Sequence, residues 1–419
     1  MGGVIQSSGS PDDGTGNGAA PPIQELGRGG WLSTAASPLH WGWLSIGSFN
    51  FVQGYDNFSG GSPGALQGVV HSSIFGTEVI LNPRFSRTNL AFQWRPQAGV
   101  IAGKFADNLN NQNVSFDLTT LVTPRFSIRF QDHFSYQPAQ SIFSEGFLYA
   151  AESIDNRSIQ SSFIDGPGIW LTNTATLSFG YGLSPLTTIT VAPRYNYAHV
   201  IDNSSAVSPT IPQSQLRLIG SKEYGGSVSI SHRLSPMKSI GMYYSVNDVK
   251  FDTAPDAIWY HILGGTYSQQ LRPSLFANLT AGAATVSFNT SGSRGWTFTG
   301  TADIEKTIHV GTLALAYNRG LSLNRYASRN FTDRVDVNYR TLLTRRSSTA
   351  LGFGYEHVNG TPSISGKYAT AQIGYRLLRN LSLLMTYMFR DQVGDGLQAY
   401  TDSRHSAYVS LNWDPLHMR

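Results

Sequence analysis

The chain has 419 residues, enough for one large barrel or for two or three soluble domains. Charged residues make up only 13% of it, about half the share in soluble proteins, while aromatic residues reach 12%. The net charge of +4, with no block of consecutive Lys or Arg, gives no support to nucleic-acid binding. The lack of cysteine excludes disulfides and thiolate chemistry, and no run of about 18 apolar residues is present to form a transmembrane helix.

Residues 1–40 are rich in Gly, Ser and Pro, which predicts a flexible N-terminal tail. The segment Met1–Gln6 begins polar, and no basic and apolar leader follows it, so we interpret the chain as mature-like. The remainder, 41–414, is predicted to form a single β domain.

From residue 41 onward, apolar and polar residues alternate, which predicts strands with one apolar face. In 380–391, for example, Leu383 and Met385 lie on one face and Ser382 and Thr386 on the other. We predict about eighteen strands, or sixteen if the first two do not form. The predicted spans are 41–54, 70–81, 88–102, 112–122, 126–137, 172–182, 187–199, 223–233, 238–250, 257–270, 274–288, 295–307, 311–325, 333–344, 347–358, 367–377, 380–391 and 404–414.

The connections between these strands alternate between tight turns, such as 123–125, 234–238 and 378–380, and longer polar loops. Transmembrane β-barrels show this alternation, with short periplasmic turns and long extracellular loops. The predicted fold is therefore an all-β, antiparallel transmembrane barrel of 16–18 strands with both termini in the periplasm. A β-propeller is disfavoured because only two strands fill each period and no blade signature recurs.

If the apolar face meets lipid, the polar face lines the interior, and a lumen of this width is water-filled. The predicted pore-lining residues are Arg95, Asp117, Arg129, Gln131, His133, Arg194, Asn196, Asp303, Glu305, Arg334, Asp336, Arg340, Gln372 and Arg376. Two hypotheses remain open for the arginines: they form a basic path for anionic or sugar-like solutes, or they pair with carboxylates and stiffen the wall. His232 and Arg319 do not fit the outward face, and we expect them near an interface or beside a bulge.

The longest loop, 138–171, carries many apolar residues, so we expect it to fold into the lumen as a constriction rather than to be disordered. Its candidate constriction residues are Phe143, Glu145, Phe147, Tyr149, Asp165 and Trp170.

The strand number and the alternating connections resemble those of bacterial outer-membrane porins across the whole of 41–414. The segments "TPRFSIRF" and "SIRFQDHFSY" are similar to hairpins of porins from Gram-negative soil bacteria, and "SAYVSLNW" resembles the closing strand of such barrels. The six residues after Trp413 depart from that pattern. The resemblance implies an outer-membrane channel for passive diffusion of small polar or anionic solutes. Its implied partners are outer-membrane lipid, those solutes and, since porins are often trimers, two further copies.

Two other functions fit the same fold: an outer-membrane component of a polysaccharide or other export system, and a structural or adhesive barrel that displays its loops. We expect no enzyme, no cofactor and no metal site. The pairs Asp132–His133 and Glu356–His357 are adjacent in sequence, so their side chains point to opposite faces, and the remaining histidines are dispersed.

Overall fold

The computed structural model describes residues 39–41, 44–60, 68–83, 85–102, 107–138, 169–200, 220–252, 257–288, 292–323, 329–359, 363–395 and 400–413. Strands account for nearly all of these residues. Within the same ranges, no helix has the length and apolar character needed to cross a membrane.

The strands follow one another along the chain with short gaps. The first nine are β1 (Leu39–Trp41), β2 (Leu44–Gly60), β3 (Gly68–Leu81), β4 (Thr88–Ala102), β5 (Asp107–Thr123), β6 (Phe126–Pro138), β7 (Ile169–Ser184), β8 (Thr187–Val200) and β9 (Ser221–Ser235). The others are β10 (Lys238–Phe251), β11 (Ala257–Arg272), β12 (Leu275–Phe288), β13 (Gly292–Ile308), β14 (Gly311–Leu323), β15 (Arg329–Leu342), β16 (Ser347–Asn359), β17 (Ser363–Leu378), β18 (Leu381–Asp395) and β19 (Tyr400–Trp413).

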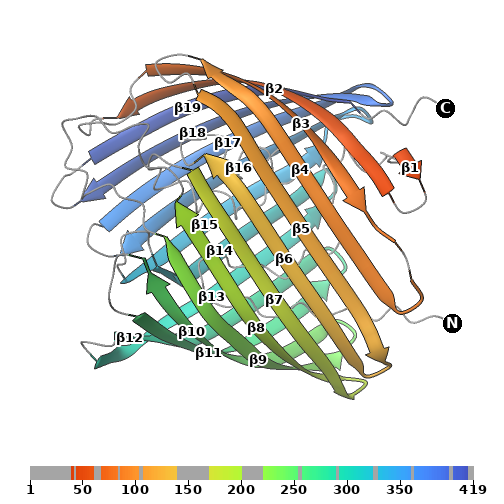
Figure 1. Ribbon diagram of the computed structural model, residues 1–419, viewed down its shortest axis with the longest axis vertical. Coiled ribbons are helices and arrows are strands. Elements are labelled where there is room, and N and C mark those ends of the chain that lie inside the picture. Colours follow the sequence, from red (N-terminus) through yellow and green to blue (C-terminus); the bar gives the residue numbers. More distant parts are fainter. Residues whose placement is uncertain are drawn as a thin grey trace.

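The sheet closes on itself (Figure 1). From β2 to β19 each strand pairs antiparallel with the next, and β19 returns to β2 through a ladder from Trp413↔Phe49 to Asp402↔Gly60. The three-residue β1 pairs with β2 beside this ring, so eighteen of the nineteen strands in the described ranges form the wall. Closure removes the exposed sheet edges that would otherwise favour aggregation. The predicted all-β antiparallel barrel is confirmed, with eighteen strands.

The strand ends at the tight turns lie close to the predicted positions, as at Thr123–Phe126 and Leu378–Leu381. The opposite ends extend further than predicted: β2 continues to Gly60 rather than residue 54, and β5 begins at Asp107 rather than 112. Most residues of these extensions are polar, with Tyr55, Phe58 and Leu109 as exceptions. Their ladders rest on backbone hydrogen bonds, which do not require an apolar side chain, so a pattern of side-chain polarity ends too early.

The two faces of the wall differ as the alternation predicted. In β19, Ser406, Tyr408 and Ser410 are buried, whereas Val409 and Leu411 on the opposite face are exposed. Elsewhere on the outer face Phe298, Phe353 and Ile373 are more than half exposed. A continuous exposed belt of large apolar side chains is incompatible with water but suits lipid. The fold is therefore that of a transmembrane β-barrel.

Candidate functional site

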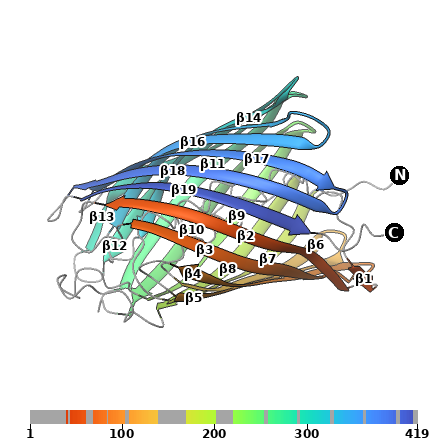
Figure 2. The same ribbon diagram turned by 90° about the horizontal axis from the view of Figure 1, so that it is seen from above.

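The candidate site is the inward face of the wall, whose strands Figure 2 shows from a second direction. All fourteen predicted pore-lining residues lie in strands and on this face, because each is a register partner of another inward position. Arg129 pairs with Thr119, for example, Asp303 with Asn278, and Gln372 with Ala350. The structure does not gather them into one cluster but spreads them over several sectors of the wall.

Two of these sectors contain a cross-strand ion pair. On β3 and β4, Arg95 Nε donates to Glu78 Oε1 at 2.8 Å, and the Gln93 amide also donates to Glu78. On β5 and β6, Arg129 Nε donates to Asp117 Oδ2 at 3.1 Å. The Arg129 side chain is 40% exposed, the largest value among the inward ion-paired arginines of the described ranges. Arg129 and Asp117 are therefore the ionic pair most accessible to a solute in the lumen.

A third ion pair is tied to a neighbouring strand. Arg194 of β8 donates to Glu223 of β9 at 2.7 Å, and the Asn196 amide donates to the same carboxylate at 2.9 Å. The Tyr260 hydroxyl of β11 also donates to Glu223, although β10 lies between the two strands. Both charged side chains are about a tenth exposed. This network joins three strands across an intervening fourth and favours the wall-stiffening hypothesis for Arg194.

A buried charged belt crosses β15 to β19. Arg334 donates to Asp336 at 2.7 Å, and the Tyr368 hydroxyl donates to Asp336 as well. Gly354 lies beneath the Tyr368 ring, where an added Cβ would come within 2.2 Å of a ring carbon. The belt contains six side chains that are each between 2% and 6% exposed: Arg334, Asp336, Glu356, Tyr368, Arg390 and Arg404. Removal of one partner of a buried ion pair lowers the stability by about 3–5 kcal/mol. The belt therefore stabilises the wall, and its burial leaves it little contact with bulk solvent.

The prediction that a polar face lines the interior is wrong for β10 to β12. An inward apolar sector lies there, and its members are at most 7% exposed: Val249, Phe251, Ile258, Tyr260, Ile262 and Val286. Strand β11 is apolar on both faces, because Trp259 and Leu263 face outward between these residues. The nearly continuous apolar run "AIWYHIL" indicates a strand that is apolar on both faces. The prediction overlooked it because it assumed a polar inner face throughout.

The predicted constriction falls largely outside the described residues. Phe143, Glu145, Phe147, Tyr149 and Asp165 lie within 139–168 and stay sequence predictions. Trp170 is placed differently from the prediction: it belongs to β7, where its backbone pairs with Gln137 and Val200. Strand β7 begins at Ile169, whereas the predicted loop ended at residue 171. Residues 169–171 therefore belong to the strand and not to the loop.

The structure also places the candidate dyad Asp132–His133 and the two residues that did not fit the outward face, Arg319 and His232. Asp132 faces outward and accepts a hydrogen bond from Asn173 at 2.8 Å, while His133 faces inward, so the two form no dyad. Arg319 faces outward and pairs with Asp333 at 2.8 Å, four residues from the loop end of β14. His232 lies near a tight turn, with Nδ1 2.9 Å from the Thr187 hydroxyl. Both residues lie near a strand end, and their interfacial location stays a prediction.

Comparisons with known proteins add similarity of fold only. No family model matches the chain, and no curated protein sequence matches it. Among solved structures, OccAB4 of Acinetobacter baumannii is 9% identical with a TM-score of 0.47, over 88% of this chain and 98% of that one. The outer membrane protein OpdK of Pseudomonas aeruginosa is 10% identical with a TM-score of 0.44, over 88% and 99%. OccK9 (OpdG) of the same organism is 10% identical with a TM-score of 0.45, over 88% and 98%. These values are too low to transfer a function.

The class of the protein follows from its own geometry. An eighteen-stranded closed wall with an apolar outer belt and polar and charged inward side chains defines a transmembrane β-barrel of the outer-membrane type. The architecture expected from the resemblance to porins is present.

Proposed function

We propose that the protein is a porin of the bacterial outer membrane, through which small polar solutes diffuse passively. The observation that carries the proposal is the inward face of a closed eighteen-stranded wall, where partly exposed ionic groups such as Arg129 and Asp117 meet the lumen. Barrels of about this strand number leave an aqueous channel that their own side chains do not fill.

The balance of charge on the inward face supports only a modest preference for anions. The described inward side chains include nine arginines and seven carboxylates, which leaves a surplus of two positive charges. They are Arg95, Arg129, Arg194, Arg233, Arg334, Arg340, Arg376, Arg390 and Arg404 against Glu78, Asp117, Glu223, Asp303, Glu305, Asp336 and Glu356. Ion pairs compensate Arg95, Arg129 and Arg194, so the wall-stiffening hypothesis gains support for these three.

Solute uptake and ion selectivity test the proposal separately. Liposomes that contain the purified protein should swell when placed in small neutral sugars, and liposomes without it should not. In planar bilayers, Arg129→Ala should shift the reversal potential toward cations, whereas Arg334→Ala should leave it nearly unchanged because the Arg334 side chain is 3% exposed. If liposomes that contain the protein do not swell in sugar solutions, the proposal of a porin is wrong. Equal shifts of the reversal potential for the two variants would contradict the assignment of Arg129 as a lumen-facing charge.

From the sequence we further propose that the loop 138–171 narrows the lumen. Deletion of 143–165 should then raise single-channel conductance. Unchanged conductance in a folded deletion variant would favour a barrel that displays this loop outward.

A further inference from the structure

The eight tight turns of the barrel carry charges of one sign only. Consecutive strands from β2 to β19 are antiparallel and every second connection is a tight turn, so all eight turns lie at the same end of the barrel. Together they contain eight Lys or Arg residues and no Asp or Glu. We call these segments the tight-turn rim; they are 81–88, 123–126, 184–187, 235–238, 272–275, 308–311, 342–347 and 378–381.

The connections at the opposite end of the barrel have the reverse balance of charge. Their sequences contain nine Asp or Glu residues and only five Lys or Arg. The positive charge of the tight-turn rim is therefore a matter of position along the chain and does not follow from the small net charge of +4. The connections counted are 60–68, 102–107, 138–169, 200–221, 251–257, 288–292, 323–329, 359–363 and 395–400.

The cations of the tight-turn rim are accessible. Seven of the eight lie in the described part of the chain, and one of them, Lys238, is half-buried with its Nζ 5.3 Å from the centroid of the Tyr267 ring. Within the described ranges, none of the seven forms an ion pair with a carboxylate, so the wall does not neutralise their charge. The other six are exposed: Arg87, Arg125, Arg272, Arg345, Arg346 and Arg379.

Three of these cations lie on two neighbouring hairpins. Arg345 and Arg346 are in the turn between β15 and β16, and Arg379 is in the turn between β17 and β18. Strands β16 and β17 pair up to Ser347↔Tyr375, and the Arg376 backbone N–H donates to the Arg346 carbonyl oxygen at 2.8 Å. This sector therefore has the densest positive charge among the described turns.

Large apolar side chains accompany the cations at every tight turn. One lies in each turn or one residue before it, and these side chains are between 43% and 63% exposed: Phe85, Val122, Leu186, Met237, Leu271, Val310, Leu343 and Leu378. Exposed apolar groups beside cations suit the interface of a membrane, where the apolar groups enter the acyl region and the cations reach the phosphates.

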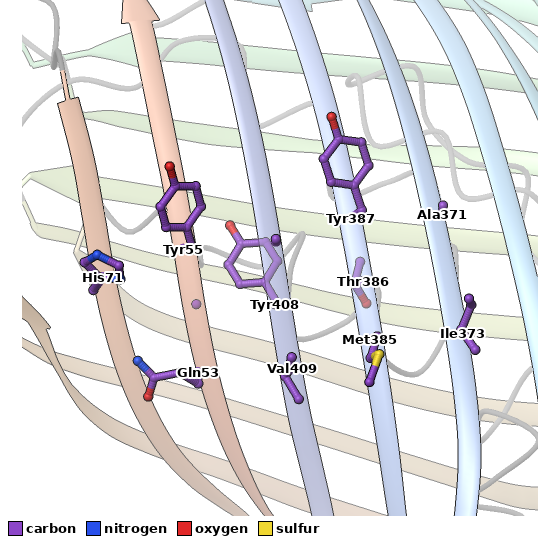
Figure 3. Close-up of a pocket in the computed structure, with 12 residues that line it drawn as sticks. Gln53, Tyr55, His71, Ala371, Ile373, Met385, Thr386, Tyr387, Tyr408 and Val409 are labelled. Atoms are coloured by element: carbon purple, nitrogen blue, oxygen red, sulfur yellow. The ribbon is translucent and has the colours of Figure 1, made fainter.

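Charge is absent from a part of the outer face that lies further from the rim. A depression over β17, β18, β19, β2 and β3 is lined by side chains such as Ile373, Met385 and Val409 (Figure 3). Its described lining residues include no Lys, Arg, Asp or Glu. The tight-turn rim is thus a cationic border to the lipid-facing apolar belt.

We propose that the tight-turn rim binds the headgroups of anionic phospholipids. Guanidinium and ammonium groups donate to phosphate oxygens, and a leaflet with anionic lipids attracts cations that lie at its surface. The predicted orientation places the rim in the periplasmic leaflet, which consists of phospholipids. Continuity with the apolar belt favours a membrane lipid over a soluble anion. This binding does not depend on the proposed conduction through the lumen.

Native mass spectrometry of the full-length protein in detergent tests the proposal, with phosphatidylglycerol and zwitterionic phosphatidylcholine as probes. The wild type should retain phosphatidylglycerol to higher collision energy than phosphatidylcholine. The triple variant Arg345→Gln, Arg346→Gln, Arg379→Gln should lower the ratio of phosphatidylglycerol-bound to free protein by about fivefold or more, the contribution of at least one cation at an anionic surface. Its retention of phosphatidylcholine should hardly change.

A matched control removes the same charge near the opposite end of the strands. The triple variant Lys222→Gln, Lys250→Gln, Lys367→Gln replaces three exposed cations near the loop ends of β9, β10 and β17, and should leave retention of phosphatidylglycerol unchanged. All six substituted side chains are exposed, so both variants should fold, and heat-modifiable mobility on gels verifies this. Equal retention of the two lipids by the wild type would overturn the proposal. Equal losses in the two triple variants would overturn the rim as the binding surface.

Discussion

The outward and inward faces of the wall can be compared directly at two adjacent residues of β18. Met385 faces outward and is 48% exposed, whereas Thr386 faces the lumen and lies 3.4 Å from the Gln372 amide. Met385 is four residues beyond Leu381 at the tight turn, about 13 Å along the strand and about 10 Å along the barrel axis at the usual tilt. An apolar band about 25 Å tall puts this position near its middle.

Arginine at position 385 should therefore lower the free energy of unfolding by about 2–4 kcal/mol, because its charge would meet lipid close to the midplane. That range reduces the ratio of folded to unfolded protein by about 30- to 1000-fold. Arginine at position 386 meets the polar lumen and should cost less than about 1 kcal/mol.

Equilibrium unfolding in urea, with the protein in lipid vesicles, measures both variants against the wild type. Met385→Arg should move the midpoint to much lower urea without changing the slope, and Thr386→Arg should hardly move it. A larger loss for Thr386→Arg than for Met385→Arg would refute the assignment of the faces.

Three further pairs of substitutions test other parts of the wall. Gly354→Ala should destabilise the barrel by about 1–3 kcal/mol because its Cβ would meet the Tyr368 ring. Gly265→Ala should cost less, because the nearest atom to its Cβ is 3.5 Å away. Equal urea midpoints for the two variants would contradict this packing. Ile262→Ala should cost about 2–5 kcal/mol as a buried member of the inward apolar sector, and exposed Leu263→Ala about 1 kcal/mol by the same measurement; the reverse order would refute the inward apolar sector. Cysteine at Asp252 should react with an impermeant maleimide on intact cells and cysteine at Ser235, at the other end of β9–β10, should not; labelling at Ser235 alone would invert the orientation.

The fold was predictable from the sequence because a barrel strand repeats one simple rule. Alternation of apolar and polar side chains identified all eighteen strands, and the alternation of short and long connections identified the antiparallel order. The same rule failed where a residue obeys a different constraint. The polar ends of β2 and β5 are held by backbone ladders, and Trp170 joins β7 for the same reason.

The candidate site was predictable in its faces but not in its contacts. Alternation assigns Arg129 and Asp117 to the inward face, yet their contact depends on the register between β5 and β6, which a single sequence does not fix. Glu223 was missed as the partner of Arg194 because the two are 29 residues apart. The inward apolar sector was missed because β11 has apolar residues on both faces, and the prediction assigned apolar residues only to the lipid-facing side.

Single-channel recording from the purified wild-type protein in a planar bilayer tests the central claim most directly, namely that the eighteen-stranded wall encloses a water-filled path. Protein verified as folded by heat-modifiable mobility should insert in discrete steps of equal, ohmic conductance that scale with salt concentration. Folded protein that inserts into the bilayer without any conductance steps would contradict the porin.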